Sequence, residues 1–160
     1  MLKNLKKKQE GFTIIEVMIV LVIAAVILLI VFLAVPALQR NSRNTQRKNE
    51  AASLLAAASE YSSNNNGKVP GSVSGSVSAD VTAIKALTKN RNITELKIES
   101  STGTTAATLS QAVLRYKSAC DTTVTPVVTK TGTSDRQIAL LYQVEDGSGA
   151  GVNACAESGL

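Results

Sequence analysis

VMIVLVIAAVILLIVFLAV, residues 17–35, contains no polar side chain and decides the fold of this chain. Its 19 residues are mostly Val, Ile and Leu, and about 20 apolar residues suffice for a helix to cross a bilayer. A secretory signal peptide has a shorter apolar core of about 7 to 15 residues, followed by a small-residue cleavage site. Here the run continues into PALQR, residues 36–40, without such a site. The sequence therefore predicts a transmembrane helix.

The helical pattern continues beyond this apolar run. Between Pro36 and Gly67 there is no further Gly or Pro, and apolar residues recur at roughly helical spacing. These residues are Leu38, Ala51, Leu54, Leu55, Ala58 and Tyr61. We predict one long helix over about residues 12–62, roughly 75 Å long at about 1.5 Å per residue. Gly67 suits the left-handed cap that ends such a helix.

The pattern of the residues that follow the long helix predicts a small globular part, which we call the head. Asp80 is placed as the N-cap of a short amphipathic helix through Val81, Ile84 and Leu87. Alternating patterns then predict strands over residues 93–98, 112–118, 124–130 and 137–145, close enough in sequence to pair antiparallel. The expected fold class is α+β. A long N-terminal helix, half transmembrane and half amphipathic, would form a spine packed against a small antiparallel sheet.

Composition and charge narrow the class of protein. The chain has no His, no Trp and only five aromatic residues, so a general base of the usual kind and stacking platforms for nucleic-acid bases are poorly supplied. We expect no catalytic site, no cofactor and no metal site. Of the net charge of +5, three charges lie in residues 1–11, and a second basic group follows the apolar run. This group is Arg40, Arg43, Arg47 and Lys48. Because basic groups flank the membrane helix on both sides, the charge bias favours neither orientation of the helix strongly.

The stretch KKKQEGFTIIE, residues 6–16, resembles the leader and processing site of type IV pilins and pilin-like proteins. The resemblance implies a leader peptide of residues 1–11, cut after Gly11 by a prepilin peptidase, and N-methylation of the new first residue, Phe12. It also implies that Glu16, the fifth residue of the mature chain, acts in filament assembly. The domains are then the leader, the transmembrane and assembly half-helix 12–37, and residues 38–160 with the amphipathic half-helix and the head.

Glu16 is a carboxylate at the start of an otherwise apolar helix. Such a charge costs on the order of 2 to 3 kcal/mol near the membrane centre and less towards the interface, so it needs a partner. The resemblance supplies one, because cleavage leaves a free amine on Phe12 that can pair with Glu16 of a neighbouring subunit. The alternative is an interfacial carboxylate that only reaches towards the head groups.

Cys120 and Cys155 are the only cysteines. Both lie in the part that would be exported, where oxidising conditions permit a disulfide, and the resemblance adds that the family often carries a C-terminal bridge. We predict a disulfide that contributes roughly 4 kcal/mol in the chain-entropy model. Two unpaired thiols that fill apolar space are the alternative.

These observations predict a non-enzymatic structural subunit of an extracellular type IV pilus or pilus-like filament. The resemblance implies a single-pass cytoplasmic (inner) membrane protein before assembly and a surface filament afterwards. Its partners would be the membrane, further copies of itself, the prepilin peptidase, and the assembly platform and ATPase. An uncleaved single-span anchor is the plain alternative for the apolar run.

Two alternatives within the family remain open. A minor pilin of a DNA-uptake fibre would contact a ligand or nucleic acid through basic side chains, namely Lys85, Lys89, Arg91 and Lys97. A pseudopilin of a secretion system would be favoured by calcium near the C-terminus, but Asp121, Asp135, Glu145 and Asp146 form no recognisable calcium motif. Whether the filament serves adhesion, twitching, DNA uptake or secretion is not encoded in these patterns.

Overall fold

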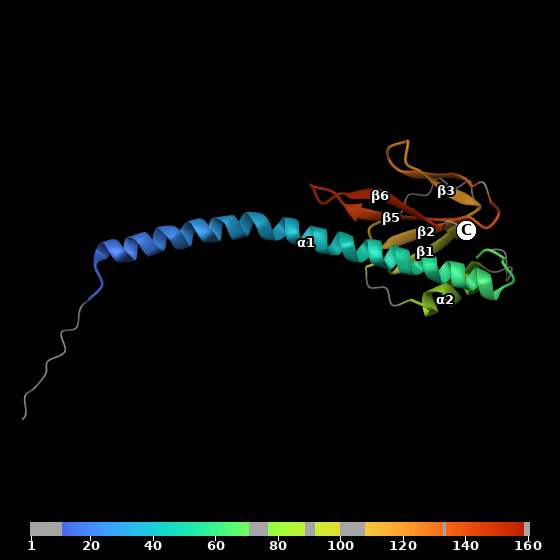
Figure 1. Cartoon of the computed structure of the whole chain (residues 1–160), viewed down its shortest axis with the longest axis horizontal. Helices are drawn as coiled ribbons and strands as arrows, with labels where there is room; N and C mark the ends of the chain where they lie inside the picture. The colour runs from blue at the N-terminus through green and yellow to red at the C-terminus, as the bar shows by residue number, and fades with distance from the viewer. Residues whose placement is uncertain (1–10, 71–76, 89–91, 100–107, 133, 159–160) are drawn as a thin grey trace, which may run out of the picture. The chain divides into compact units, whose positions relative to one another are not determined.

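The computed structural model describes residues 11–70, 77–88, 92–99, 108–132 and 134–158 (Figure 1). The chain divides into two compact units, Met1–Leu38 and Gln39–Leu160. The first unit contains the apolar part of helix α1, and the second contains the rest of α1 together with the head.

Helix α1 spans Ile14–Asn64, within two residues of the predicted bounds at each end, and continues through Pro36. It ends as the sequence predicted. Gly67 has a φ of 76°, a left-handed conformation that glycine adopts without a steric penalty. Its amide donates to the carbonyl of Ser62 over 2.9 Å, which satisfies one of the carbonyls left open at the helix end.

The head contains the four-stranded sheet β1-β2-β5-β6 and a two-stranded ribbon of β3 and β4 (Figure 1). The strands are β1 (Glu95–Glu99), β2 (Gln111–Tyr116), β3 (Ser118–Asp121), β4 (Val128–Thr131), β5 (Ile138–Glu145) and β6 (Gly151–Glu157). Together with α1 they form the predicted α+β fold with a largely antiparallel sheet.

The expectation that neighbouring strands all pair antiparallel is wrong for β1 and β2. These strands pair in parallel, with Leu96 opposite Ala112 and Ile98 opposite Leu114. An antiparallel pair needs only a turn between its strands, whereas the parallel pair of β1 and β2 requires the connection over residues 100–110 to return along the strand. A connection of this length is long enough for that return, because an extended chain covers up to about 3.3 Å per residue.

Three further predictions of local structure need correction. Strands β3 and β6 were not expected, because their small and polar residues lack a clear alternating apolar pattern. The strand expected over 124–130 is only Val128–Thr131. Asp80 is not an N-cap, since helix α2 (Val77–Ala86) begins three residues earlier. Asp80 is instead buried and accepts a hydrogen bond of 2.5 Å from the Tyr61 hydroxyl, which ties α2 to α1.

The core of the head lies between α1 and one face of the sheet. Ala51, Leu54 and Ala58 are almost fully buried on α1, at the helical spacing the sequence predicted. They belong to one apolar cluster with Leu114 of β2 and Leu140 of β5. The buried stripe on α1 is therefore made largely of small residues.

The opposite face of the sheet carries Val113 and Leu141, against which Cys155 packs. The predicted disulfide is present and joins Cys120 of β3 to Cys155 of β6, with their Cα atoms 5.8 Å apart. The fully buried Arg115 of β2 donates to Thr129 of β4 over 2.7 Å, which is a second link between the sheet and the ribbon. Strands β3 and β4 have four residues each and little apolar surface of their own to bury. The disulfide therefore attaches this ribbon to the sheet.

Removal of the disulfide should destabilise the head. We expect Cys120→Ser with Cys155→Ser to lower the free energy of unfolding by about 4 kcal/mol, because the unfolded chain regains loop entropy. Pulse proteolysis of the full chain in neutral detergent across a urea series measures this change. Reduction of the parent protein should give the same loss, and an unchanged urea midpoint in both samples would contradict the expectation.

Candidate functional site

The predicted cleavage site is open in the structure. Phe12 is 86% exposed, and a Cβ added at Gly11 would meet no atom within 4 Å. A protease therefore meets no folded structure at this bond among the described residues, which begin at Gly11. Residues 1–10 of the expected leader lie outside the described part of the chain. Cleavage after Gly11 and methylation of Phe12 stay predictions.

Glu16 forms a capping box with Thr13 at the start of α1. One carboxylate oxygen, Oε2, accepts hydrogen bonds from the backbone amide of Thr13 over 2.8 Å and from its hydroxyl over 2.7 Å. The Thr13 hydroxyl in turn accepts from the Glu16 amide over 3.3 Å. These reciprocal bonds satisfy amides that an α-helix leaves open at its N-terminus. The pattern Thr-x-x-Glu before an apolar run indicates such a box. It was not among the two roles expected for Glu16, which were an intermolecular partner and an interfacial carboxylate.

The apolar side chains of α1 are uncovered within the first unit. All residues from Gly11 to Leu38 are exposed, including Phe32 at 76% and Leu33 at 74%. Among the helices in the described residues, α1 alone is long and apolar enough to cross a membrane. In water this surface would be unfavourable by roughly 25 cal/mol for each Å² of apolar area. Lipid or other apolar helices must therefore cover it.

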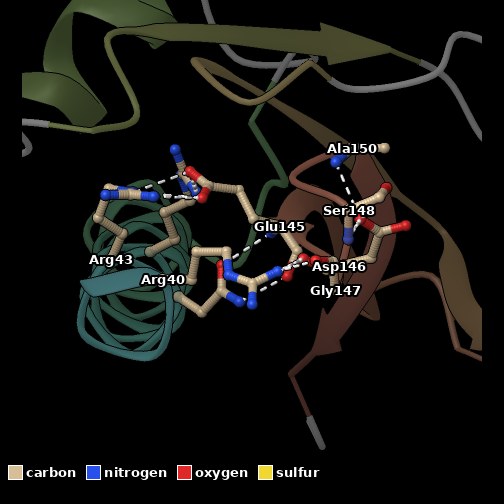
Figure 2. A network of polar contacts seen from close by, with 9 residues as sticks. Arg40, Arg43, Glu145, Asp146, Gly147, Ser148 and Ala150 are labelled. Atoms are coloured by element: carbon tan, nitrogen blue, oxygen red, sulfur yellow. Dashed lines mark hydrogen bonds and ion pairs between the residues drawn. The ribbon is translucent and has the colours of Figure 1, made fainter. Parts of the chain in front are cut away.

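In the head unit, the four residues Arg40, Arg43, Arg47 and Lys48 of α1 form a basic belt, and Glu145 at the end of β5 binds two of them (Figure 2). Arg43 donates two hydrogen bonds to the Glu145 carboxylate, from Nε over 3.0 Å and from Nη2 over 2.7 Å. Arg47 donates Nη1 to the same carboxylate over 2.8 Å. The side chains of Arg47 and Glu145 are each only 9% exposed, so this pair is largely removed from water.

The backbone around Glu145 is held by the same segment of α1. The Asn44 side-chain amide donates to the carbonyl of Glu145, and its oxygen accepts from the amide of Glu145, each over 2.7 Å. Arg40 donates to the carbonyls of Asp146 and Gly147. Figure 2 shows that the Asp146 carboxylate faces its own turn, where it accepts from Ser148 and Ala150. This network was not predicted, since nothing in the sequence pairs Arg43 with a residue about a hundred positions away.

These contacts shift the pKa of the groups involved. Hydrogen bonds from Arg43, and then from Arg47, lower the pKa of Glu145 to about 2 from an ordinary value of 4.5. The bond to Glu145 raises the pKa of Arg43. The Ser148 hydroxyl and the amides of the turn lower the pKa of Asp146. The network is therefore built around an ionised Glu145.

The residues named for the two alternatives are not gathered into one site. Lys85 donates to the carbonyl of Thr94 over 2.7 Å, Lys97 lies 3.9 Å from Glu95, and Lys89 and Arg91 fall outside the described residues. Asp121 accepts from Thr123, and Asp135 pairs with Lys117, while Glu145 and Asp146 belong to the network at the end of β5. Within the described ranges, no group of three His, Cys, Asp or Glu side chains is placed to hold a metal ion.

Comparison with known proteins bears on the N-terminal segment. Residues 6–32 match the family described as the prokaryotic N-terminal methylation motif. The chain carries the hallmark of type IV prepilins and pilin-like proteins. The match includes Gly11, Phe12, Thr13 and Glu16 and ends within the apolar run, so the head lies outside it. No curated protein and no solved structure was found to match the chain.

The stability of the head should depend on pH through Glu145. Because its pKa is lower in the folded state, Glu145 stabilises the head above about pH 4.5, and this contribution is lost as the pH falls towards 2. We expect Glu145→Gln to unfold at a lower temperature than the parent at pH 7, with a difference that disappears near pH 2. Thermal unfolding of both proteins by circular dichroism between these pH values tests this. A difference that stays constant with pH would show that the charge of Glu145 contributes nothing.

Proposed function

We propose that this protein is a structural subunit of an extracellular type IV pilus or pilus-like filament. It is made as a prepilin, held in the cytoplasmic membrane by the apolar part of α1, and cut after Gly11. It then leaves the membrane and packs its apolar helix against those of identical subunits. The observation that carries the proposal is the methylation motif of residues 6–32, which includes the start of a fully exposed apolar helix.

The exposed helix supports the proposed assembly, because its apolar surface must be shielded from water in every state of the protein. In the membrane, lipid chains supply that cover. In a filament, neighbouring helices replace the lipid, so the subunit moves between two apolar environments without a large loss of burial. The subunit itself need not supply energy for this exchange, which is the proposed role of an assembly ATPase and platform protein. No enzymatic activity is part of the proposal.

Glu16 supports the proposed order of assembly. Its carboxylate is exposed and bound only by Thr13 among the described residues, so the bonds that hold it are local and accessible. After cleavage, the ammonium group of Phe12 on an incoming subunit is a stronger donor, since charge-assisted bonds are roughly twice as strong as neutral ones. An apolar surround strengthens this pairing and penalises a Glu16 that has no partner. Glu16 would thereby place each new subunit in register.

Processing should leave Phe12 as the first residue of the mature protein. The basic leader, Gly11 and the apolar run together form the signal that a prepilin peptidase would read. Intact-mass analysis of the protein from cells with an active peptidase should show loss of residues 1–11 and the mass of one methyl group on Phe12. A chain that retains its leader in such cells would contradict the pilin proposal.

Glu16→Ala should leave insertion and head folding intact but reduce filament assembly by about tenfold, the value of a charge-assisted hydrogen bond. Glu16→Gln should also be impaired, because the amide keeps the shape but not the charge. The measurement is the ratio of sheared filament subunit to membrane-pool subunit, at matched expression and with leader removal checked.

Thr13→Ala is the matched control for this experiment. It removes the hydroxyl of the capping box but leaves the Glu16 carboxylate available to a neighbour. If Glu16 acts through the amine of another subunit, Thr13→Ala should assemble nearly as well as the parent. Equal losses in Thr13→Ala and Glu16→Ala would show that Glu16 matters only as a helix cap.

A further inference from the structure

The disulfide of the head joins β3 of the ribbon to β6 at one edge of the four-stranded sheet. Cys120 and Cys155 are both half-buried, so a small thiol in solution can reach the bond. A thiolate opens a disulfide by attacking one of its sulfurs and displacing the other as a thiolate. The surroundings of the two sulfurs therefore decide which thiols open this bond and how fast they do so.

The Glu157 carboxylate of β6 lies beside Cys120 of β3. Its Oε2 accepts a hydrogen bond of 2.8 Å from the backbone amide of Cys120, although the two residues belong to different sheets. Only a few covalent bonds separate that amide from Sγ of the same cysteine, so the negative charge of Glu157 is held within a few ångströms of the sulfur. Glu157 is itself exposed, so its charge also acts on reagents in solution.

Asp121 places a second carboxylate next to Cys120, but its charge is partly offset. Hydrogen bonds from the Thr123 hydroxyl and amide, and then the attraction of Lys130, lower the pKa of Asp121. Lys130 of β4 therefore lies near Asp121, whereas Glu157 forms no ion pair with another side chain of the described residues. The charge next to the Cys120 sulfur is therefore negative on balance.

Both routes of attack on the bond place negative charge near Glu157. A thiolate that attacks Cys120 arrives beside the carboxylate and displaces the Cys155 thiolate into apolar contact with Val113 and Leu141. A thiolate that attacks Cys155 must enter that apolar contact, and it displaces the Cys120 thiolate beside Glu157. Apolar surroundings disfavour a thiolate, and so does a neighbouring carboxylate. Each route is therefore slowed, and further negative charge on the reagent slows it more.

We propose that the bond between Cys120 and Cys155 is a thiol-exchange site that selects among thiols by charge, with Glu157 as the group that repels anionic thiols. A cationic or neutral thiolate forms a mixed disulfide with one cysteine and displaces the other as a thiolate. A second thiolate then releases the protein sulfur, the reagent leaves as its own disulfide, and the two cysteine thiolates take up protons from water. Anionic peptide thiols of the glutathione type react slowly, so the ribbon stays attached to the sheet in their presence. This property belongs to the head alone and goes beyond the proposed function.

The rates at which three thiols open the bond test this selection. The full chain in neutral detergent is treated with an excess of cysteamine, 2-mercaptoethanol or glutathione, whose thiol forms carry one positive, no and one negative net charge. The cysteines that become free are trapped by alkylation and counted by mass spectrometry. For each reagent the rate in Glu157→Gln is divided by the rate in the parent, which cancels the intrinsic reactivity of the reagent. Glutamine keeps an oxygen that can accept from the Cys120 amide, so the local structure is retained.

We expect this quotient to rise from cysteamine through 2-mercaptoethanol to glutathione, by about two- to threefold for each unit of charge. In about 1 M salt, where the Debye length is roughly 3 Å, the three quotients should converge. Glu95→Gln is the matched control, because it removes an exposed carboxylate from β1 at the opposite edge of the sheet, and it should leave all three rates unchanged. Glu157→Asp keeps the charge and should give nearly equal quotients for the three thiols.

Equal acceleration of all three thiols in Glu157→Gln would overturn the selection by charge, because the variant would then only loosen the ribbon. Quotients near one for every thiol, or a spread that persists at high salt, would also overturn it. If Glu157→Gln does not fold, the parent alone decides the matter. At low salt its ratio of cysteamine to glutathione rates should exceed the ratio for the same chain unfolded in urea, and equal ratios would contradict the proposal.

Discussion

The apolar surface of α1 is the constraint on which the rest of this structure depends. A helix whose side chains from Gly11 to Leu38 are all exposed cannot remain in water, and nothing within its own unit covers it. In the proposed assembly, the subunit would therefore exchange one apolar environment for another without passing free through solvent. This explains why a single helix carries both the membrane anchor and, in the proposed filament, the assembly surface. It also explains why the head must reach a stable fold without help from that part of the helix.

The head meets this requirement with a small core and several covalent and polar ties. Ala51, Leu54 and Ala58 give α1 a narrow buried stripe, so the helix contributes modestly to the apolar core. The disulfide between Cys120 and Cys155 holds the ribbon of β3 and β4, and the Tyr61 hydroxyl holds α2. A domain of this size buries a smaller share of its surface than a larger one does, so such ties count for more.

The sequence predicts those features that depend on composition along one segment. The long helix, its end at Gly67 and the membrane-spanning run follow from residue type and spacing alone. The disulfide was predicted because the two cysteines lie in the part expected to be exported, where oxidising conditions permit a bond, and because the family often carries a C-terminal bridge. The capping box of Thr13 and Glu16 also corresponds to a local pattern, Thr-x-x-Glu, although only an intermolecular partner or an interfacial position was expected for Glu16.

The remaining features depend on contacts between distant segments. The parallel pairing of β1 with β2 follows from the path of a long connection, which local pattern does not define. Glu145 ends a strand in the sequence and gives no sign that two arginines of α1 will bind it. Strand β6 is recognisable only through its pairing with β5, since its residues alternate weakly.

The two charged sites beside the apolar run differ in a way that fits their positions in the chain. Glu16 is exposed, and a few local bonds from Thr13 satisfy it, so another donor can replace them at little cost. The side chains of Glu145 and Arg47 are each only 9% exposed, and removing one partner of such a pair leaves the other charge uncompensated. The first site is therefore suited to exchange during assembly, and the second to permanent attachment of the head to its helix. In the proposed filament, a subunit that had these properties reversed would neither place its neighbours in register nor keep its head attached while its helix changes surroundings.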